Sequence, residues 1–183
     1  MHGALPQLDA ETRAAERPGD HKNDLRLWLR LLTCATLIET EVRKRLREDF
    51  GETLPRFDLM AQLHKSPEGL TMSALSRRMM VSNGNLTALV ERLAAGGKIK
   101  RRQDSSDRRS VVVRLTRPGA SAFARMARAH EGWIGALFGG FSRAERARLM
   151  KSLGLAKNSV RGAVSGMDKP VSRMKRRAVR GKS

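Results

Sequence analysis

Hydrophobic residues in this chain mostly recur at the spacing of one face of an α-helix, and in one short stretch they alternate as in a β-strand. The helical pattern predicts helices over about 23–50, 55–66, 74–80, 82–95, 120–138 and 142–165. The alternating pattern predicts a strand over 110–116, with 98–103 as its hairpin partner and 70–72 as a third, short strand. We therefore expect a mainly α fold with one small antiparallel sheet.

The helix predicted over 23–50 is hydrophobic on two sides in its first half. One stripe holds Leu25, Trp28, Leu29, Leu32, Ala35 and Thr36, and a second holds Leu27, Leu31, Cys34 and Ile38. A helix that is apolar on two sides is buried on two sides. It could be the central helix of a monomer, but a helix shared between its own domain and a second copy is favoured. The charged second half, 39–49, should be more exposed. Cys34 should be a buried structural cysteine, with an oxidant sensor as the less favoured alternative.

The helix predicted over 82–95 has one apolar and one small, polar face. Ser82 is a good N-cap, and Leu86, Leu89, Val90 and Leu93 form the apolar stripe. The opposite face holds Gly84, Ala88 and Glu91, flanked by Asn83, Asn85, Thr87 and Arg92. Small residues permit close approach, and Asn and Thr can bind base edges or phosphates in a major groove. An ordinary solvated helix face is the alternative.

The predicted hairpin that follows is strongly basic. Its cations are Lys98, Lys100, Arg101, Arg102, Arg108, Arg109, Arg114 and Arg117, against Asp104 and Asp107. A basic hairpin directly after a helix with a small outer face is the layout of a winged helix on DNA. With Ser73 as the expected cap of the helix over 74–80, this arrangement predicts a winged helix-turn-helix lobe plus a helical dimerisation region.

Charge and composition narrow the function classes. The formal net charge of +19 indicates an anionic partner. No run approaches the ~18 apolar residues of a membrane span, and no signal-peptide layout is present, so nucleic acid in the cytoplasm is expected and a membrane is not. The single cysteine and four scattered histidines form no catalytic or metal-binding motif. We therefore expect no enzyme activity, cofactor or metal. A sequence-independent architectural nucleic-acid-binding protein remains the alternative.

One set of motifs resembles the MarR-type winged-helix regulators. It comprises Asp107-x-Arg109 and then Leu115-Thr116-x-x-Gly119, after a helix that ends in Gly97, and the resemblance covers roughly 25–165. The run Val81-Ser82-Asn83-Gly84-Asn85-Leu86-Thr87 further resembles the branch that controls aromatic-acid catabolism. Many members carry a basic residue where Ala88 stands, so base contacts should differ here. The resemblance implies a homodimeric repressor on an inverted-repeat operator in double-stranded DNA, released by an aromatic acid or its coenzyme A thioester.

The expected DNA-binding residues lie in the helix-turn-helix and the hairpin: Arg77, Arg78, Ser82, Asn83, Gly84, Asn85, Thr87, Arg92, Arg102, Asp107, Arg108 and Arg109. Arg108 and Arg109 should reach the backbone and minor groove. Asp107 either orients Arg109 or is a turn residue, or both. The expected ligand-binding residues are Arg26, Trp28, Arg30, Leu32, Phe57, Met60, Met126 and His130. For the six that are not arginines, ordinary core is the favoured alternative, whereas the two arginines are spaced to meet the phosphates of a thioester.

Four segments are expected along the chain. A flexible arm occupies 1–20, and 21–50 with 120–166 forms the helical dimerisation region. The DNA-binding lobe occupies 51–119, and 167–183 forms a disordered basic tail that either aids solubility or attracts DNA. Glycine and proline at Phe50-Gly51 and Pro118-Gly119 suggest pivots between the lobe and the dimer helices.

Overall fold

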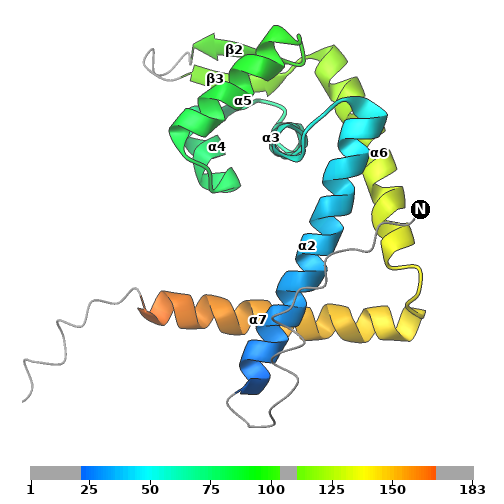
Figure 1. The fold of residues 1–183 in the computed structure, drawn as a ribbon. Coiled ribbons are helices and arrows are strands. Elements are labelled where there is room, and N and C mark those ends of the chain that lie inside the picture. Colours follow the sequence, from blue (N-terminus) through cyan, green and yellow to red (C-terminus); the bar gives the residue numbers. More distant parts are fainter. Residues whose placement is uncertain (1–21, 104–110, 168–183) are drawn as a thin grey trace, which may run out of the picture. The chain divides into compact units, whose positions relative to one another are not determined.

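A computed structural model describes residues 22–103 and 111–167. The elements in chain order are α2 (Asn23–Phe50), α3 (Leu54–His64), β1 (Leu70–Thr71), α4 (Met72–Met79), α5 (Asn83–Ala95), β2 (Ile99–Gln103), β3 (Val111–Leu115), α6 (Arg117–Leu137) and α7 (Arg143–Met167). The predicted fold class is confirmed, with a winged helix-turn-helix built from α4, α5 and the β2–β3 hairpin (Figure 1). The chain divides into two compact units between Leu137 and Phe138. The predicted N-terminal arm and the tail beyond Met167 lie outside the described residues.

Helix α3 lies at the centre of the first unit, where Figure 1 shows it nearly end-on. It contacts α2, α4, α5, α6 and β3, and its Leu59, Met60 and Leu63 are almost completely buried. Phe57 extends this core toward α6, with its ring centroid 5.5 Å from that of Phe123 and 5.1 Å from that of His130. The lobe and the long helices α2 and α6 therefore share one continuous hydrophobic core.

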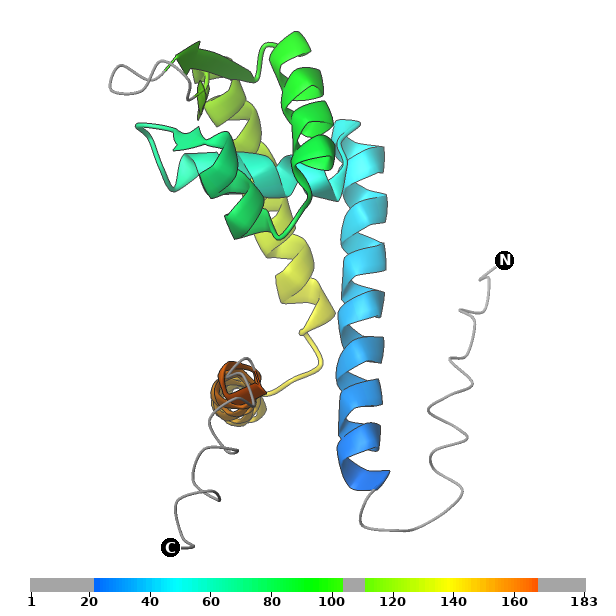
Figure 2. The ribbon, with the colours of Figure 1, turned by 90° about the vertical axis from the view of Figure 1, so that its left-hand side faces the viewer.

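The second half of α2 is more buried than the first half, which is the reverse of the prediction. Val42 and Leu46, in the charged second half, are its buried residues, and α2 packs there along α6 (Figures 1 and 2). Val42 and Leu46 are four positions apart, so one narrow face of the helix is enough to bury both. The i,i+4 ion pairs Glu39–Arg43 and Glu41–Arg45 lie on other faces of the helix. The prediction of a more exposed second half is therefore wrong for the single chain.

The hydrophobic first half of α2 is largely exposed in the single chain. It extends beyond the lobe in both views (Figures 1 and 2), and Leu25, Leu27 and Trp28 are each more than half exposed. Cys34 is also exposed, so its predicted burial is wrong for the single chain.

Helices α4 and α6 begin earlier than predicted. Thr71, rather than Ser73, caps α4, because β1 brings Thr71 in with an extended backbone and its Oγ1 accepts a hydrogen bond from the Ala74 N–H at 3.2 Å. Helix α6 begins at Arg117 rather than after Gly119. Proline is tolerated in a first helical turn, so Pro118 lies inside α6.

The sheet has the strand order β1-β3-β2, and both pairs are antiparallel. Leu70 pairs with Val113 on one side, and Ile99 pairs with Leu115 on the other. Val113 is fully buried under the sheet. Gly69 approaches β3 so closely that a Cβ there would lie 2.6 Å from Val112 Cγ1. The predicted pairing of a short strand with the wing is confirmed.

The second unit contains α7, which opens with the predicted capping box. The Glu145 carboxylate accepts hydrogen bonds from the Ser142 N–H and hydroxyl, and the Glu145 N–H donates back to Ser142 Oγ at 3.3 Å. These bonds lower the pKa of Glu145. The apolar side of α7 is exposed within its unit, including Met150, Val160 and Val164. Among the described residues, no helix has the length and apolar character needed to span a membrane.

Candidate nucleic-acid interface

The turn between α4 and α5 is held by hydrogen bonds on both sides. Met80 ends α4 in the left-handed region, at φ 53° and ψ 38°. The Ser76 hydroxyl then donates to the Val81 carbonyl at 2.8 Å, and Ser82 Oγ caps α5 by accepting from the Asn85 N–H at 3.4 Å. The predicted cap at Ser82 is confirmed. These bonds fix the angle at which α5 leaves α4, which is what a helix-turn-helix needs to present its second helix.

Helix α5 has one buried and one open face, as its sequence pattern predicts. Leu86, Val90 and Leu93 are buried against the core. The six DNA-binding residues predicted on and beside this helix are all exposed: Ser82, Asn83, Gly84, Asn85, Thr87 and Arg92. A Cβ added at Gly84 would meet no atom within 4 Å. The outer face of α5 is therefore open for another molecule to approach the helix backbone.

The chemistry of this open face suits base edges. Asn83 and Asn85 carry amide groups that both donate and accept hydrogen bonds. The Thr87 hydroxyl already donates to the Asn83 carbonyl at 2.9 Å, so its proton is engaged within the helix. The carboxylate of Glu91, toward the end of the helix, lies 3.9 Å from an Arg101 nitrogen on β2, which partly offsets its negative charge.

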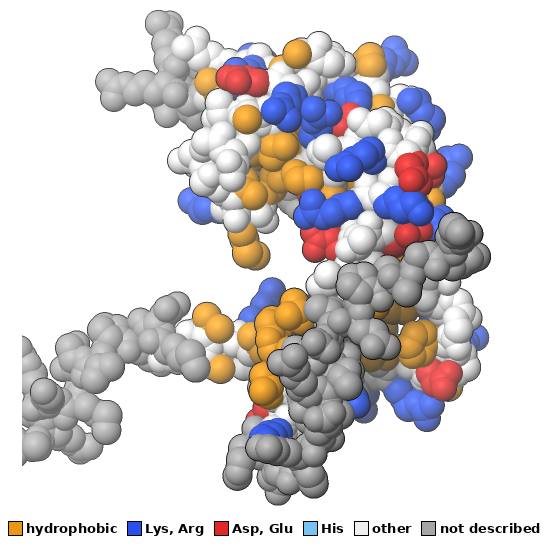
Figure 3. Space-filling model, in the orientation of Figure 1, with side chains coloured by type: hydrophobic (Ala, Val, Ile, Leu, Met, Phe, Trp, Pro, Cys, Tyr) orange, Lys and Arg blue, Asp and Glu red, His pale blue; other side chains and the backbone are white. Residues whose placement is uncertain are grey.

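Exposed cations flank α5 on both sides. Arg77 and Arg78 lie in the last turn of α4, where Arg78 donates to Ser66 Oγ at 3.0 Å. Arg102 is exposed on β2. Figure 3 shows Lys and Arg side chains spread over the lobe, with acidic side chains between them. Asp107, Arg108 and Arg109, the predicted residues of the wing tip, lie outside the described residues.

Two basic residues of the hairpin have internal partners. Arg114 donates to the Glu68 carbonyl at 2.7 Å and lies 3.3 Å from the Glu68 carboxylate. Lys98 forms an ion pair with the buried Glu52. The positive charge of the hairpin is thus divided between side chains that brace the lobe and side chains that face outward.

Sequence reasoning missed Met80 and Glu52. Met80 is 92% exposed at the turn before α5, in a conformation that favours glycine. The sequence feature that could have identified it is a methionine at the end of a helix, where glycine is usual. The pairing of Glu52 with Lys98 had no local signal, because the two residues are 46 positions apart.

The eight predicted ligand-binding residues do not gather in one cavity of the single chain. Phe57, Met60 and Met126 are buried in the core, and His130 packs against Phe57. Trp28 and Leu32 are exposed on the first half of α2, the half that also carries Arg26 and Arg30.

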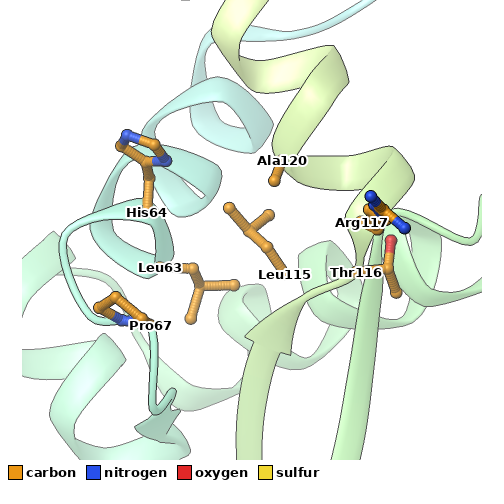
Figure 4. A pocket seen from close by; sticks show the side chains of 7 residues that line it. All are labelled: Leu63, His64, Pro67, Leu115, Thr116, Arg117 and Ala120. Carbon is orange, nitrogen blue, oxygen red and sulfur yellow. The ribbon is translucent and has the colours of Figure 1, made fainter.

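Two surface cavities lie elsewhere, and none of the eight residues lines either one. The first, about 310 Å³, lies between α3, β3 and the start of α6, with Leu63 and Leu115 toward its floor and His64 and Arg117 on opposite sides (Figure 4). The second, about 260 Å³, lies between α2, α3 and α4 and includes Glu39, Arg43, Asp58 and Arg78. Partial burial raises the pKa of the Asp58 carboxyl, while nearby His130 and Arg43 oppose that rise.

Comparison with known proteins identifies the family. The MarR family model matches residues 53–111, which contain the helix-turn-helix and the start of β3. The transcriptional activatory protein BadR of Rhodopseudomonas palustris is 30% identical over 134 residues, which cover 70% of this chain and 76% of BadR. The chain belongs to the MarR family. It is a DNA-binding transcriptional regulator, and its relatives are regulators rather than enzymes.

Solved MarR-family structures share the fold. A MarR family transcriptional regulator from Silicibacter pomeroyi is 29% identical with a TM-score of 0.61, covering 82% of this chain and 99% of that one. Streptococcus pneumoniae FabT, solved in complex with DNA, is 22% identical with a TM-score of 0.66, covering 77% of this chain and 99% of FabT.

Proposed function

We propose that this MarR-family regulator acts as a homodimer that reads an inverted-repeat operator. In this proposal α5 enters the major groove, and the β2–β3 wing contacts the adjacent backbone. The observation that carries it is the outer face of α5, where two asparagines and a threonine surround a glycine with open space above it. A helix with that surface can lie close to base edges, and flanking arginines can neutralise phosphates.

The exposed first half of α2 supports the dimer. Leu25, Leu27 and Trp28 are each more than half exposed, and Leu31, Leu32 and Leu37 are also exposed. Soluble monomers rarely expose apolar patches of this continuity. A second copy of the chain would cover this patch, and two-fold symmetry would then present two α5 helices to half-sites about 10 bp apart.

Gly84 provides the most direct test of the α5 surface. The operator is first selected from random duplexes with the wild-type protein. Gly84→Ala should stabilise the free protein by about 0.5–1 kcal/mol, because glycine is a poor helix former and the added methyl meets no neighbour. The larger Gly84→Gln should fold normally and lose operator affinity, since its side chain would occupy the space needed by the groove.

The matched control is Gly132, a glycine of α6 whose added Cβ also meets no atom within 4 Å. Because Gly132 lies in the predicted dimerisation region, sedimentation velocity first checks that Gly132→Gln has the same oligomeric state as the wild type, and its operator binding should then be unchanged. Equal operator affinity for Gly84→Gln and the wild type would refute the placement of α5 in the groove.

We also propose that an aromatic acid or its coenzyme A thioester releases the protein from DNA as a repressor. Support comes from the resemblance of residues 81–87 to regulators of aromatic-acid catabolism, and from Trp28, Leu32, Arg26 and Arg30 on the exposed half of α2. An aromatic ring and an acidic group would suit these side chains. BadR is named an activatory protein, so transcription assays on the selected operator must decide between repression and activation.

Thermodynamic linkage tests the effector proposal. A ligand that weakens operator binding by a typical allosteric coupling, about 5- to 150-fold, must itself be weakened by the same factor when operator is bound. Calorimetric titration of aromatic acids and their thioesters, with and without saturating operator, measures this factor. Equal ligand affinities in the two titrations would rule out release by that ligand.

A further inference from the structure

Glu52 is the charged side chain that is buried within the described residues, at 3% exposure. One carboxylate oxygen pairs with Lys98 Nζ, and the other lies 3.3 Å from an Arg56 guanidinium nitrogen. Lys98 and Arg56 remain partly exposed, with side-chain exposures of 29% and 25%. The acid is therefore enclosed by the lobe, while both of its cations reach toward water.

The backbone of Glu52 is fixed to the end of α2. Gly51 adopts a left-handed conformation, with φ 63°, and donates to the Arg47 carbonyl at 3.0 Å. The Glu52 N–H donates to the Leu46 carbonyl, also at 3.0 Å, and Leu46 is fully buried. Two hydrogen bonds thus cap α2 and fix the Glu52 backbone relative to that helix.

Lys98 lies where the recognition helix, the wing and α6 meet. Its N–H donates to the Leu93 carbonyl near the end of α5 at 2.9 Å, and its carbonyl accepts from the Thr116 N–H at 3.0 Å. The Thr116 hydroxyl donates to the Gly97 carbonyl at 2.7 Å and accepts from the Gly119 N–H at 3.0 Å. Position 119 must be glycine, because a Cβ there would lie 1.8 Å from the Lys98 carbonyl oxygen.

These contacts favour a braced junction over the pivot expected at Pro118-Gly119. The Glu52–Lys98 pair joins the end of α2 to the base of the wing and the end of α5, while Thr116 joins the same point to the start of α6. The Phe50-Gly51 corner is braced in the same way by its cap.

We infer that Glu52 is a positioning residue for DNA recognition: it sets the orientation of the wing base and of α5 relative to α2 and α6. The inference rests on the proposed use of α5 and the wing on DNA. A buried ion pair contributes little net stability compared with an apolar pair of the same size, but it demands a strict geometry. That property suits a residue whose task is to fix the spacing of two distant recognition surfaces.

Removal of the Glu52 charge distinguishes a positioning role from a simple electrostatic role, because the two roles predict opposite changes in affinity for the operator. Loss of a carboxylate from a protein that binds a polyanion should tighten binding to any DNA. Loss of a positioning contact should weaken binding to the operator alone. Substitutions remote from a ligand typically change coupling by about 2- to 30-fold, so Glu52→Gln should weaken operator binding by on the order of tenfold.

The experiment measures binding of the full chain to the selected operator and to an unrelated duplex of equal length, at one salt concentration. The variants are Glu52→Gln, Lys98→Met and the double variant, and circular dichroism confirms that each is folded at the assay temperature. Glu48→Gln, which removes an exposed carboxylate one turn earlier on α2, is the matched control. Glu52→Gln should lose operator preference while its affinity for the unrelated duplex stays equal or rises, and Glu48→Gln should keep the preference.

The double variant separates positioning from stability. Replacing both charges removes the ion pair between positions 52 and 98, and only the partly exposed Arg56 loses its carboxylate, so the melting temperature should partly recover relative to the single variants. Operator preference should remain lost, because neither new side chain makes the directional contact. Wild-type preference in Glu52→Gln, or a preference that recovers together with stability in the double variant, would overturn the inference.

A further variant, Arg102→Ala, shows whether a negative result refutes the positioning role of Glu52 or the proposed wing contact with DNA. If Arg102→Ala weakens operator binding and Glu52→Gln does not, only the positioning role is refuted. If neither variant changes operator binding, the proposed wing contact is refuted and the positioning role falls with it.

Discussion

The two halves of α2 have opposite sequence patterns and opposite environments. Residues 25–38 are rich in leucine, yet Leu25, Leu27 and Trp28 are exposed in the single chain. Residues 39–50 are mostly charged, yet Val42 and Leu46 lie in the core beside α6. Burial in the single chain is therefore decided by which element lies alongside, and not by how many apolar residues a segment contains.

This difference shows how one helix can serve two partners. The second half needs only a narrow apolar face to dock on its own core, and its ion pairs keep the remaining faces hydrated. The first half has two apolar stripes, and no neighbour among the described residues of its own unit buries them. We interpret the first half as the surface for a second copy of the chain.

Substitutions in the second half should cause the largest losses of stability. Leu46→Ala removes a fully buried side chain, and it should lower the free energy of unfolding by about 2–5 kcal/mol. Leu32→Ala makes the same chemical change in the first half, and it should cost less than about 0.5 kcal/mol in a monomeric background. Urea denaturation measures both, and equal losses would remove the distinction between the halves.

Substitutions in the first half should break the dimer and spare the fold. Trp28→Glu places a charge in the proposed interface, where loss of an aromatic anchor typically costs 2 kcal/mol or more, so the dimer dissociation constant should rise at least about 30-fold. Sedimentation velocity should then report a folded monomer of about 20.3 kDa. A Trp28→Glu protein that remains dimeric would place the interface elsewhere.

A smaller effect is expected at Cys34, where only the rate of reaction with a thiol reagent should change. Its side chain is exposed in the single chain but lies on the proposed dimer surface. A thiol reagent should therefore label Cys34 slowly in the concentrated wild type and quickly in Trp28→Glu. Labelling that is equally fast in both proteins would show that no second copy covers this part of α2.

The parts of the fold that could be predicted are those specified by local sequence. Ser82 and Gly96 cap α5, and alternating valines with a basic partner strand specify the wing. The α4 cap was harder, because Thr71 and Ser73 are both good caps two positions apart. Thr71 caps the helix because β1 pairs with β3 and presents it in an extended conformation.

The parts that could not be predicted depend on contacts between distant segments. Pro118-Gly119 has the composition of a flexible joint, but Gly119 is needed for close packing against Lys98. The Glu52–Lys98 pair has no periodicity or motif to reveal it. For the same reason the hydrophobic members of the predicted ligand site were selected by residue type alone, and three of them, Phe57, Met60 and Met126, lie in the core.

The stoichiometry of the complex with a selected operator tests the central claim most directly. Native mass spectrometry of the protein bound to one duplex, combined with a footprint on both strands, reports the number of chains and the symmetry of the site together. We predict two chains per duplex, with protection over two inverted half-sites centred about 10 bp apart. One chain per duplex, or protection without a symmetric sequence, would contradict the account of a two-fold dimer that reads DNA through α5.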